Sequence, residues 1–252
     1  MDNFNLYAQC YDLLYQDKDY QREVDYVDEL IQQQSPAANQ ILDLGCGTGV
    51  HAQLFLAKGY NVDGVDLSEE MIVRAKRNFG DEEDLHFEQG DLRSFRNGKQ
   101  YPIVTSLFHV FSYQNSNEDL EKAFKTAHTH LSPGGILVFD FWYGPGVLTD
   151  PPVVREKTLG NDRIGVVRKA IPEMHVDRNV VDVNYHLQIT ELSSGKVEVV
   201  KEKHSMRYLF QPEIELFLSL AGFDMQGCYQ WLSTDAPSLD TWNAVVVAKK
   251  KS

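Results

Sequence analysis

The chain has 252 residues, 42% hydrophobic and 24% charged, a balance typical of a globular protein and not of a disordered or fibrous one. With 24 basic and 37 acidic residues its net charge is −13, which disfavours nucleic acid and anionic membrane surfaces as partners. No apolar stretch approaches the roughly 18–20 residues that span a bilayer. The acidic N-terminus lacks the features of a secretory signal. Three widely spaced cysteines predict neither a disulfide framework nor a zinc site, so we expect a cytoplasmic protein.

The first 142 residues alternate between helical and strand patterns. Five short apolar runs are predicted as strands: 41–44, 61–66, 85–89, 103–108 and 136–141. Four segments are predicted as helices: 20–31, 49–58, one that Ser68 caps, and one that Asn117 caps and that runs to about 131. Residues 132–135 are expected to form a turn. The alternation predicts a parallel sheet that helices cover on both faces.

The pattern changes after residue 142. Residues 143–153 are rich in glycine and proline and are expected to form a loop. Three or four antiparallel strands are predicted between 163 and 210, with turns near 177–179 and 193–195. A helix and two strands complete the chain: 212–221, 223–231 and 242–248. We therefore expect one α/β domain over 1–142 and 208–252, with an antiparallel β insert over 143–207 that covers the substrate pocket.

A glycine-rich loop is the strongest motif. It runs Asp43-Leu44-Gly45-Cys46-Gly47-Thr48-Gly49 between a predicted strand and a predicted helix. Glycines let the backbone approach a ligand closely, and a helix N-terminus offers unpaired N–H groups. The dinucleotide fingerprint requires glycine at the sixth place of its loop, where this chain has Val50. The spacing therefore argues against a nicotinamide cofactor.

This loop resembles that of the class I S-adenosylmethionine-dependent methyltransferases. Three further motifs of that family follow in order: Asp66 after the second strand, 88–92 after the third, and 131–135 before the fifth. The resemblance implies a Rossmann-like, seven-stranded, mostly parallel sheet. It also implies S-adenosylmethionine as methyl donor, S-adenosylhomocysteine as product, and no metal.

The resemblance also implies roles for single residues around the cofactor. Asp66 would hold both ribose hydroxyls, although in isolation it is also a good helix N-cap, and Asp91 would bind the adenine amine. The implied cofactor site further includes Gly45, Gly47, Leu67, Met71 and Leu92, of which Met71 and Leu92 pack on the adenine ring. Asp43 either binds the methionine amino group or braces the loop.

The N-terminal segment carries tyrosines at helical spacing: Tyr7, Tyr11 and Tyr15. They form either a helix packed on the core or a lid over the cofactor. Here the chain is similar to a narrower group, the N,N-dimethyltransferases of dTDP-linked 3-amino sugars. These share a Tyr-Asp-x-x-Tyr segment, a histidine two residues after the last glycine (here His51), and an insert in the same place. In the functional alternative, Tyr11 contacts the substrate, and Tyr15 contacts the cofactor and assists catalysis.

The ends of the fourth and fifth strands are predicted to line the acceptor pocket. Phe108 and His109 would lie beside the departing methyl group, with His109 either accepting a proton or serving as a buried structural histidine. His109 departs from the smaller residues expected in the amino-sugar enzymes. Trp142 and Tyr143 either pack on a sugar ring or form rim packing. Arg207 pairs either with a ligand diphosphate or carboxylate or with a neighbouring acid.

The sequence thus predicts methyl transfer from S-adenosylmethionine to a small molecule by in-line displacement. An amine, such as that of an amino-sugar nucleotide, is the first choice of acceptor. The alternatives are a small-molecule O-methyltransferase and a non-catalytic protein that binds S-adenosylmethionine or S-adenosylhomocysteine. Neither nucleic acid nor membrane is expected as a partner, and the insert and aromatic surface are compatible with a homodimer.

Overall fold

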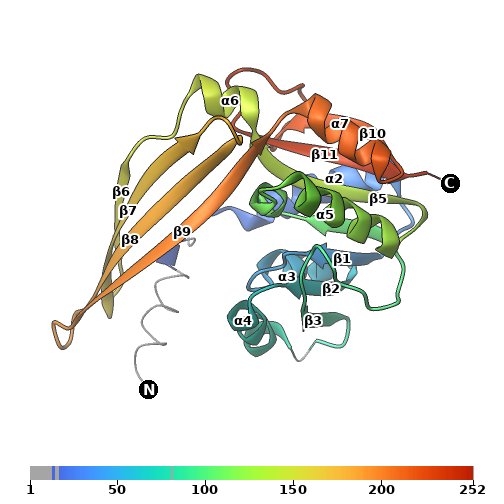
Figure 1. The fold of residues 1–252 in the computed structure, drawn as a ribbon. Helices are drawn as coiled ribbons and strands as arrows, with labels where there is room; N and C mark the ends of the chain where they lie inside the picture. Colours follow the sequence, from blue (N-terminus) through green and yellow to red (C-terminus); the bar gives the residue numbers. More distant parts are fainter. Residues whose placement is uncertain (1–12, 15–16, 81, 252) are drawn as a thin grey trace. The chain divides into compact units, whose positions relative to one another are not determined.

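The computed structural model describes residues 13–14, 17–80 and 82–251 (Figure 1). Tyr7, Tyr11 and Tyr15, which the sequence singled out, lie outside these residues. The chain divides into two compact units. The larger unit comprises Tyr20–Asp150 and Arg207–Ser252, and the smaller unit comprises Pro151–Met206 together with the described residues before Tyr20.

The larger unit contains the expected seven-stranded sheet, in the order β3-β2-β1-β4-β5-β11-β10. Its strands are β1 (Gln40–Leu44), β2 (Asn61–Asp66), β3 (Leu85–Gln89), β4 (Tyr101–Ser106), β5 (Leu131–Tyr143), β10 (Phe223–Gln230) and β11 (Asn243–Lys250). The first five run parallel, β11 is antiparallel to β5, and β10 is antiparallel to β11. The expected α/β, mostly parallel architecture is confirmed.

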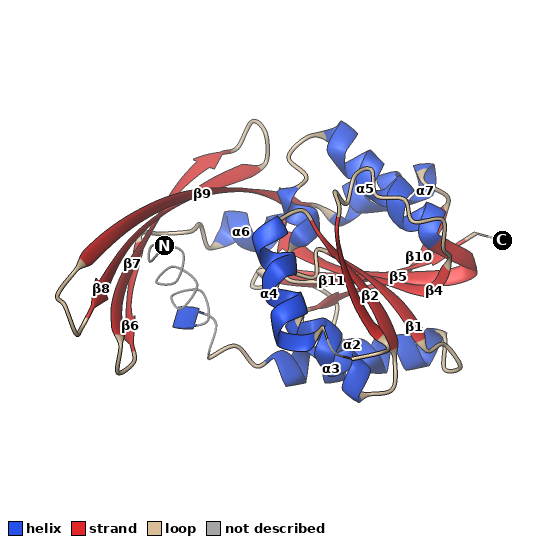
Figure 2. Cartoon of the chain, turned by 90° about the horizontal axis from the view of Figure 1, so that it is seen from below, coloured by secondary structure: helices blue, strands red, loops and turns tan. Residues whose placement is uncertain are grey.

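Helices cover both faces of this sheet, as Figure 2 shows. The helices are α2 (Tyr20–Gln34), α3 (Val50–Ala57), α4 (Glu69–Phe79), α5 (Asn117–His130), α6 (Gly144–Thr149) and α7 (Gln211–Leu220), with a short 3₁₀ helix η1 (Val110–Tyr113). Alternate residues of β5 enter different cores: Leu137 and Phe139 join the core under α5 and α7, whereas Ile136 and Val138 join the core under α2, α3 and α4. Burial on both faces explains why this strand is continuously apolar.

The smaller unit is an antiparallel sheet in the order β9-β8-β7-β6. Its strands are β6 (Arg155–Gly160), β7 (Ile164–His175), β8 (Val180–Glu191) and β9 (Val197–Leu209), whose last residues belong to the larger unit. A small core of Leu13, Ile164, Val166, Leu187 and Ile189 holds it together. The two predicted turns are confirmed where Asn179 and Gly195 take positive φ.

Several boundaries differ from the sequence prediction. Ser116, and not Asn117, caps α5, because its hydroxyl accepts the N–H of Asp119. Residues 132–135 fall within the bounds of β5 but have no partners in β4, because the ladder passes from Tyr101–Leu131 to Ile103–Ile136; they form a bulge in which Gly134 has a φ of 73°. The strand β6 was not predicted. No helix of the described chain is long and apolar enough to cross a membrane.

The expected loop over 143–153 is also wrong, because α6 occupies residues 144–149. A Cβ on Gly146 would lie 1.8 Å from the Thr241 carbonyl oxygen, so this helix packs directly on the backbone ahead of β11. The Trp242 indole N–H also donates to the Asp150 carbonyl, at 3.0 Å. These contacts hold 144–150 in the larger unit, and the smaller unit therefore begins at Pro151 and not at residue 143.

Candidate active site

Buried polar side chains gather at the carboxyl ends of the parallel strands. Asp43 of β1 and Thr105 of β4 are paired in register, and the Thr105 hydroxyl donates to Asp43 Oδ1 at 2.8 Å. Asp140 of β5 lies on the same face, because it continues the alternation of Ile136 and Val138. Ligands of open α/β sheets bind at this edge. Polar groups in an otherwise apolar layer therefore mark the candidate site.

The glycine loop after β1 takes left-handed backbone conformations at all three glycines, with φ of 87° at Gly45, 56° at Gly47 and 83° at Gly49. A Cβ on Gly45 would lie 2.5 Å from a γ-carbon of Val110, and one on Gly49 would lie 2.6 Å from Phe87. These two glycines make room for protein packing. A Cβ on Gly47 would meet nothing within 4 Å, so Gly47 is the glycine that leaves open space for a ligand.

The Asp66 carboxylate at the end of β2 joins this loop to the following helix. Its Oδ2 accepts the Gly47 N–H at 2.9 Å, and its Oδ1 accepts the Ser68 N–H at 2.8 Å. Ser68 caps α4 as predicted, because its hydroxyl accepts the Met71 N–H. A carboxylate has about four lone-pair sites, so half-buried Asp66 can still accept two hydroxyls.

Asp43 lies in a buried group of charged and polar side chains. Burial raises the pKa of its carboxyl to about 6, against the opposing effect of nearby His51. His51 contacts Glu23 through Nε2, at 2.8 Å, and packs edge-on against the Tyr20 ring with centroids 5.0 Å apart. A buried acid of this kind favours a cationic ligand group, because a positive charge would offset the unfavourable burial of the carboxylate.

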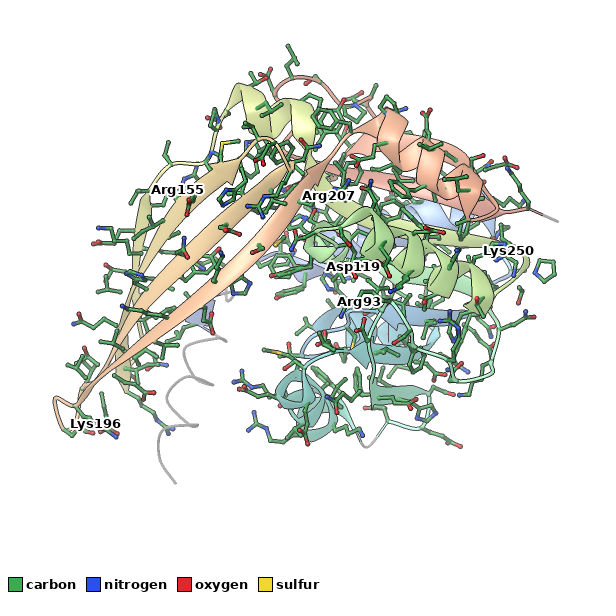
Figure 3. The ribbon with its side chains drawn as sticks, viewed as in Figure 1. Arg93, Asp119, Arg155, Lys196, Arg207 and Lys250 are labelled. Atoms are coloured by element: carbon green, nitrogen blue, oxygen red, sulfur yellow. The ribbon has the colours of Figure 1, made fainter. Side chains whose placement is uncertain are left out.

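Asp91 is engaged by a neighbouring arginine, Arg93, which lies near Asp119 (Figure 3). Arg93 Nη2 lies 2.6 Å from Asp91 Oδ2, and Nη1 reaches Asp119 Oδ1 at 3.1 Å. The Arg93 guanidinium lowers the pKa of the Asp91 carboxyl. The carboxylate predicted to bind the adenine amine thus already holds one partner. Of the apolar residues predicted around it, Leu92 is buried, Met71 is half-buried and Leu67 is 63% exposed.

The turn after β4 is strained. Phe108 and His109 both have positive φ, 67° and 63°, a conformation that costs a non-glycine residue about 1–3 kcal/mol. Asp140 holds this turn, because its Oδ1 accepts the His109 N–H at 3.0 Å. The His109 ring lies near two aromatic rings, with centroids 5.6 Å from Phe108 and 6.4 Å from Trp142. Strain held in place at a strand end is typical of a functional site.

The other predicted acceptor residues have different surroundings. Trp142 is half-buried and packs edge-on against Trp242, and Tyr143 packs against Phe141 in the core. Arg207, which is labelled in Figure 3, is buried; it donates to Asn117 Oδ1 at 2.7 Å and pairs with Glu213. Its position matches the ion-pair alternative of the sequence analysis.

Three residues of this site were not singled out from the sequence: Glu23, Thr105 and Asp140. Each is a polar residue on an apolar face, which is the one signal that the sequence offered. Asp140 is the clearest case, since it is the single charge in an apolar strand. Their mutual positions depend on strand order, which local patterns do not encode.

One side-chain cluster in the smaller unit has the composition of a cation site. Glu173, His175 and Asp182 bring their ligand atoms within 4.8 Å of one another. Asp182 also contacts the Lys203 ammonium at 2.6 Å and accepts the Ser205 hydroxyl. Burial raises the pKa of its carboxyl, but the contacts with Lys203, Ser205 and His175 outweigh it and lower the pKa to about 2. These contacts make an ion-pair network the better description of the cluster.

Comparison with known proteins agrees with this geometry. A methyltransferase domain model matches residues 41–135. The dTDP-3-amino-3,4,6-trideoxy-alpha-D-glucopyranose N,N-dimethyltransferase of Streptomyces venezuelae is 30% identical over 223 residues, covering 87% of this chain and 91% of that protein. The chain belongs to the S-adenosylmethionine-dependent methyltransferases. The methyltransferase is also 29% identical to the dTDP-3-amino-3,6-dideoxy-alpha-D-glucopyranose N,N-dimethyltransferase of Streptomyces fradiae, over 71% of this chain and 69% of that protein.

Solved structures extend the likeness over the whole methyltransferase. DesVI of Streptomyces venezuelae aligns with a TM-score of 0.80 at 25% identity, covering 100% of this chain and 99% of that one. CalS10 of Micromonospora echinaspora, an amino pentose methyltransferase solved with S-adenosylmethionine bound, has the same fold, with a TM-score of 0.77 at 21% identity over 98% of each chain. The predicted class I methyltransferase activity and its S-adenosylmethionine cofactor are thereby confirmed.

Proposed function

We propose that this methyltransferase methylates the amino group of an amino-sugar nucleotide or a similar small amine. The observation that carries the proposal is the match to a dTDP-amino-sugar N,N-dimethyltransferase over 91% of that protein's length. The acceptor end of the site, with an imidazole and a tryptophan at adjacent strand ends, is suited to an amine on a sugar ring.

In this proposal the cofactor lies along the carboxyl ends of β1, β2 and β3. Asp66 accepts the ribose hydroxyls, open space at Gly47 admits the ligand, and Asp43 faces the methionine ammonium. The proposed adenine pocket comprises Leu67, Met71, Asp91 and Leu92, and Gly45 supports the loop by packing on Val110. When bound, S-adenosylmethionine supplies a methyl group already activated on a sulfonium.

The chain's own contribution is positioning, exclusion of water and removal of a proton. Phe108 and His109 flank the acceptor nitrogen, and His109 receives the proton that the nitrogen loses. Trp142 and Tyr143 contact the acceptor. Arg207 contributes indirectly, because its guanidinium contacts Asn117 and Glu213 in the structure. Orientation of the two reactants is the larger source of rate in such a displacement.

Methyl transfer from labelled S-adenosylmethionine to a dTDP-3-amino-3,6-dideoxyhexose tests the proposal. The matched control acceptor carries a 3-hydroxyl in place of the amine. We expect label in the amino sugar alone, with stoichiometric S-adenosylhomocysteine, and the product mass counts the methyl groups. Label in the hydroxyl sugar alone would show an O-methyltransferase. S-adenosylhomocysteine binding without turnover on any amine or alcohol acceptor would favour a binding protein and overturn the proposal.

A further inference from the structure

Asp140 is an acid whose position in the core requires an explanation. It lies near the carboxyl end of the apolar strand β5 and is 1% exposed, on the sheet face that Ile136 and Val138 share. Removing a carboxylate from water costs several kcal/mol unless a partner compensates for it. Within the described part of the chain, its partner is His109. The proposed function uses His109 but gives Asp140 no role.

Both oxygens of Asp140 face the same histidine. Oδ1 accepts the His109 backbone N–H at 3.0 Å, and Oδ2 lies 2.6 Å from Nδ1 of the ring. The ring is not aligned for a linear hydrogen bond to Oδ2, but the short separation places Nδ1 directly beside the carboxylate. Nδ1 and Oδ2 are both closed to solvent and have no other partner among the described residues. Nδ1 is thus committed to Asp140, and Nε2 is the ring nitrogen left for a ligand.

We propose that Asp140 is a positioning residue that keeps the proton of His109 on Nδ1, so that Nε2 is available as the proton acceptor for the substrate amine. A carboxylate beside one imidazole nitrogen fixes the tautomer and stabilises the imidazolium that forms. The inference rests on the proposed function for its substrate. The inference also deepens the proposed function, because a site that must remove a proton from nitrogen is built for an amine.

The step balances without a further reactant. The acceptor nitrogen forms the new C–N bond with its lone pair, while the C–S bond breaks and its electron pair stays on sulfur as a neutral thioether. The methylated nitrogen then carries a positive charge, and it loses one N–H proton to Nε2 of His109. The side chain of Asp140 faces the imidazolium that results. The proton leaves to solvent before the next turnover.

The same carboxylate also fixes the direction of the ring. His109 has a left-handed backbone conformation, which a histidine rarely adopts without support. The hydrogen bond from its N–H to Oδ1 supplies that support, and Ser112 adds a second tie, because its N–H donates to the His109 carbonyl at 2.9 Å while its hydroxyl accepts the Trp142 N–H at 3.0 Å. Asp140 therefore acts on both the backbone and the ring of His109.

Asp140→Asn tests the inference, because asparagine keeps the shape and can still accept the backbone N–H while losing the charge. Asp63→Asn is the matched control, since Asp63 is a strand carboxylate that contacts Tyr101 and Lys99 and not the site. In ¹⁵N-histidine-labelled protein, two-bond ¹⁵N–¹H correlations show which ring nitrogen carries the proton, and His109→Asn assigns the signals. Calorimetry with S-adenosylhomocysteine and steady-state kinetics with the amino sugar complete the set.

We expect wild-type His109 to carry its proton on Nδ1 and Asp140→Asn to lose this preference. We also expect Asp140→Asn to lower kcat roughly 100-fold, which is within the range of general-base effects. KM and the affinity for S-adenosylhomocysteine should stay within about threefold of wild type, because the loss is confined to the proton-transfer step. A wild-type His109 that carries its proton on Nε2 would overturn the inference. So would an Asp140→Asn kcat within about twofold of the Asp63→Asn control, since an effect that small is about 0.4 kcal/mol. If no amine is methylated, the proposed function fails, and the tautomer measurement alone decides on Asp140.

Discussion

Asp43 gives the cofactor site a pH dependence that can be measured directly. Burial raises the pKa of its carboxyl to about 6 in the free protein, and a bound ammonium would lower it again. Below pH 6, binding must therefore release a proton. We expect S-adenosylhomocysteine affinity to be constant from pH 8 to about 6 and to fall by up to about tenfold per pH unit below that. Calorimetry in buffers of different ionisation enthalpy measures both quantities.

Asp43→Asn should remove this dependence, because an amide does not titrate, and should lower affinity at pH 7.5. The sign for folding is opposite to that for binding. A raised carboxyl pKa means that the charged form destabilises the fold above pH 6, and that this penalty disappears as pH falls toward the unfolded value of about 4. An affinity that stays flat to pH 5 in the wild type would contradict the assignment of Asp43 to the ligand ammonium.

The loop glycines separate protein packing from ligand binding. Gly45→Ala places a methyl group 2.5 Å from Val110 at a positive φ, so we expect it to lower the free energy of unfolding by about 2–4 kcal/mol. Gly47→Ala meets no protein atom, so we expect a loss of only about 1 kcal/mol in stability, with S-adenosylhomocysteine affinity reduced at least tenfold. Urea denaturation and calorimetry compare the two variants. Equal affinities for Gly47→Ala and wild type would show that no ligand approaches there.

At this scale the sequence identified the residues that act locally. The glycine loop, Asp66 and Ser68 were predictable because their contacts lie within a few residues or across adjacent parallel strands. Asp140 and Glu23 were not, because their partners His109 and His51 lie 31 and 28 positions away. These residues come together only through the order of the strands and the packing of the helices.

The start of α5 offers a test at the scale of one element. The Ser116 hydroxyl accepts the Asp119 N–H at 3.0 Å and donates to the Asp119 carboxylate at 2.7 Å. Ser116→Ala should therefore lower the free energy of unfolding by about 1 kcal/mol, the typical value of an N-cap. Asn117→Ala is the comparison, since it leaves this cap intact and removes the acceptor of Arg207. Thermal denaturation compares the two variants. A Ser116→Ala variant as stable as wild type would contradict the assignment of Ser116 as the N-cap.

Regular elements were predicted well where burial follows a simple period. β2 and β3 match their predicted bounds, because an apolar run ends at a polar or glycine residue in each case. The prediction failed for α6 and β6. The glycine and proline content of α6 concealed a short helix that tertiary contacts stabilise, and β6 alternates with so little burial that it gave no apolar pattern.

The two units of the chain should respond separately to core substitutions. All three tryptophans, Trp142, Trp231 and Trp242, belong to the larger unit, so tryptophan fluorescence follows that unit alone. Ile189→Ala removes buried volume from the small core of the smaller unit and should cost about 2–5 kcal/mol there. We expect amide exchange in β7 and β8 to accelerate while the fluorescence midpoint in urea stays unchanged.

Ile136→Ala is the matched control in the larger unit, where it should shift the fluorescence midpoint to lower urea. A common shift of both probes in both variants would show that the chain unfolds as one cooperative unit. The fold class of the whole molecule was predictable because strand–helix alternation specifies a parallel sheet. The division at Pro151 was not, because it depends on contacts of α6 with residues about 90 positions later.

The contact between Gly45 and Val110 has a consequence for engineering. The valine γ-carbons occupy the space that any side chain at position 45 would need, so the cofactor loop and the acceptor turn share one packing contact. A directed-evolution library that enlarges residue 110 to accept new substrates would disturb donor affinity as well. Libraries that vary Phe108 and Trp142 but retain Val110 should yield an altered acceptor range at lower cost. A smaller residue at 110 would relieve the packing conflict at position 45, although the positive φ there would still favour glycine.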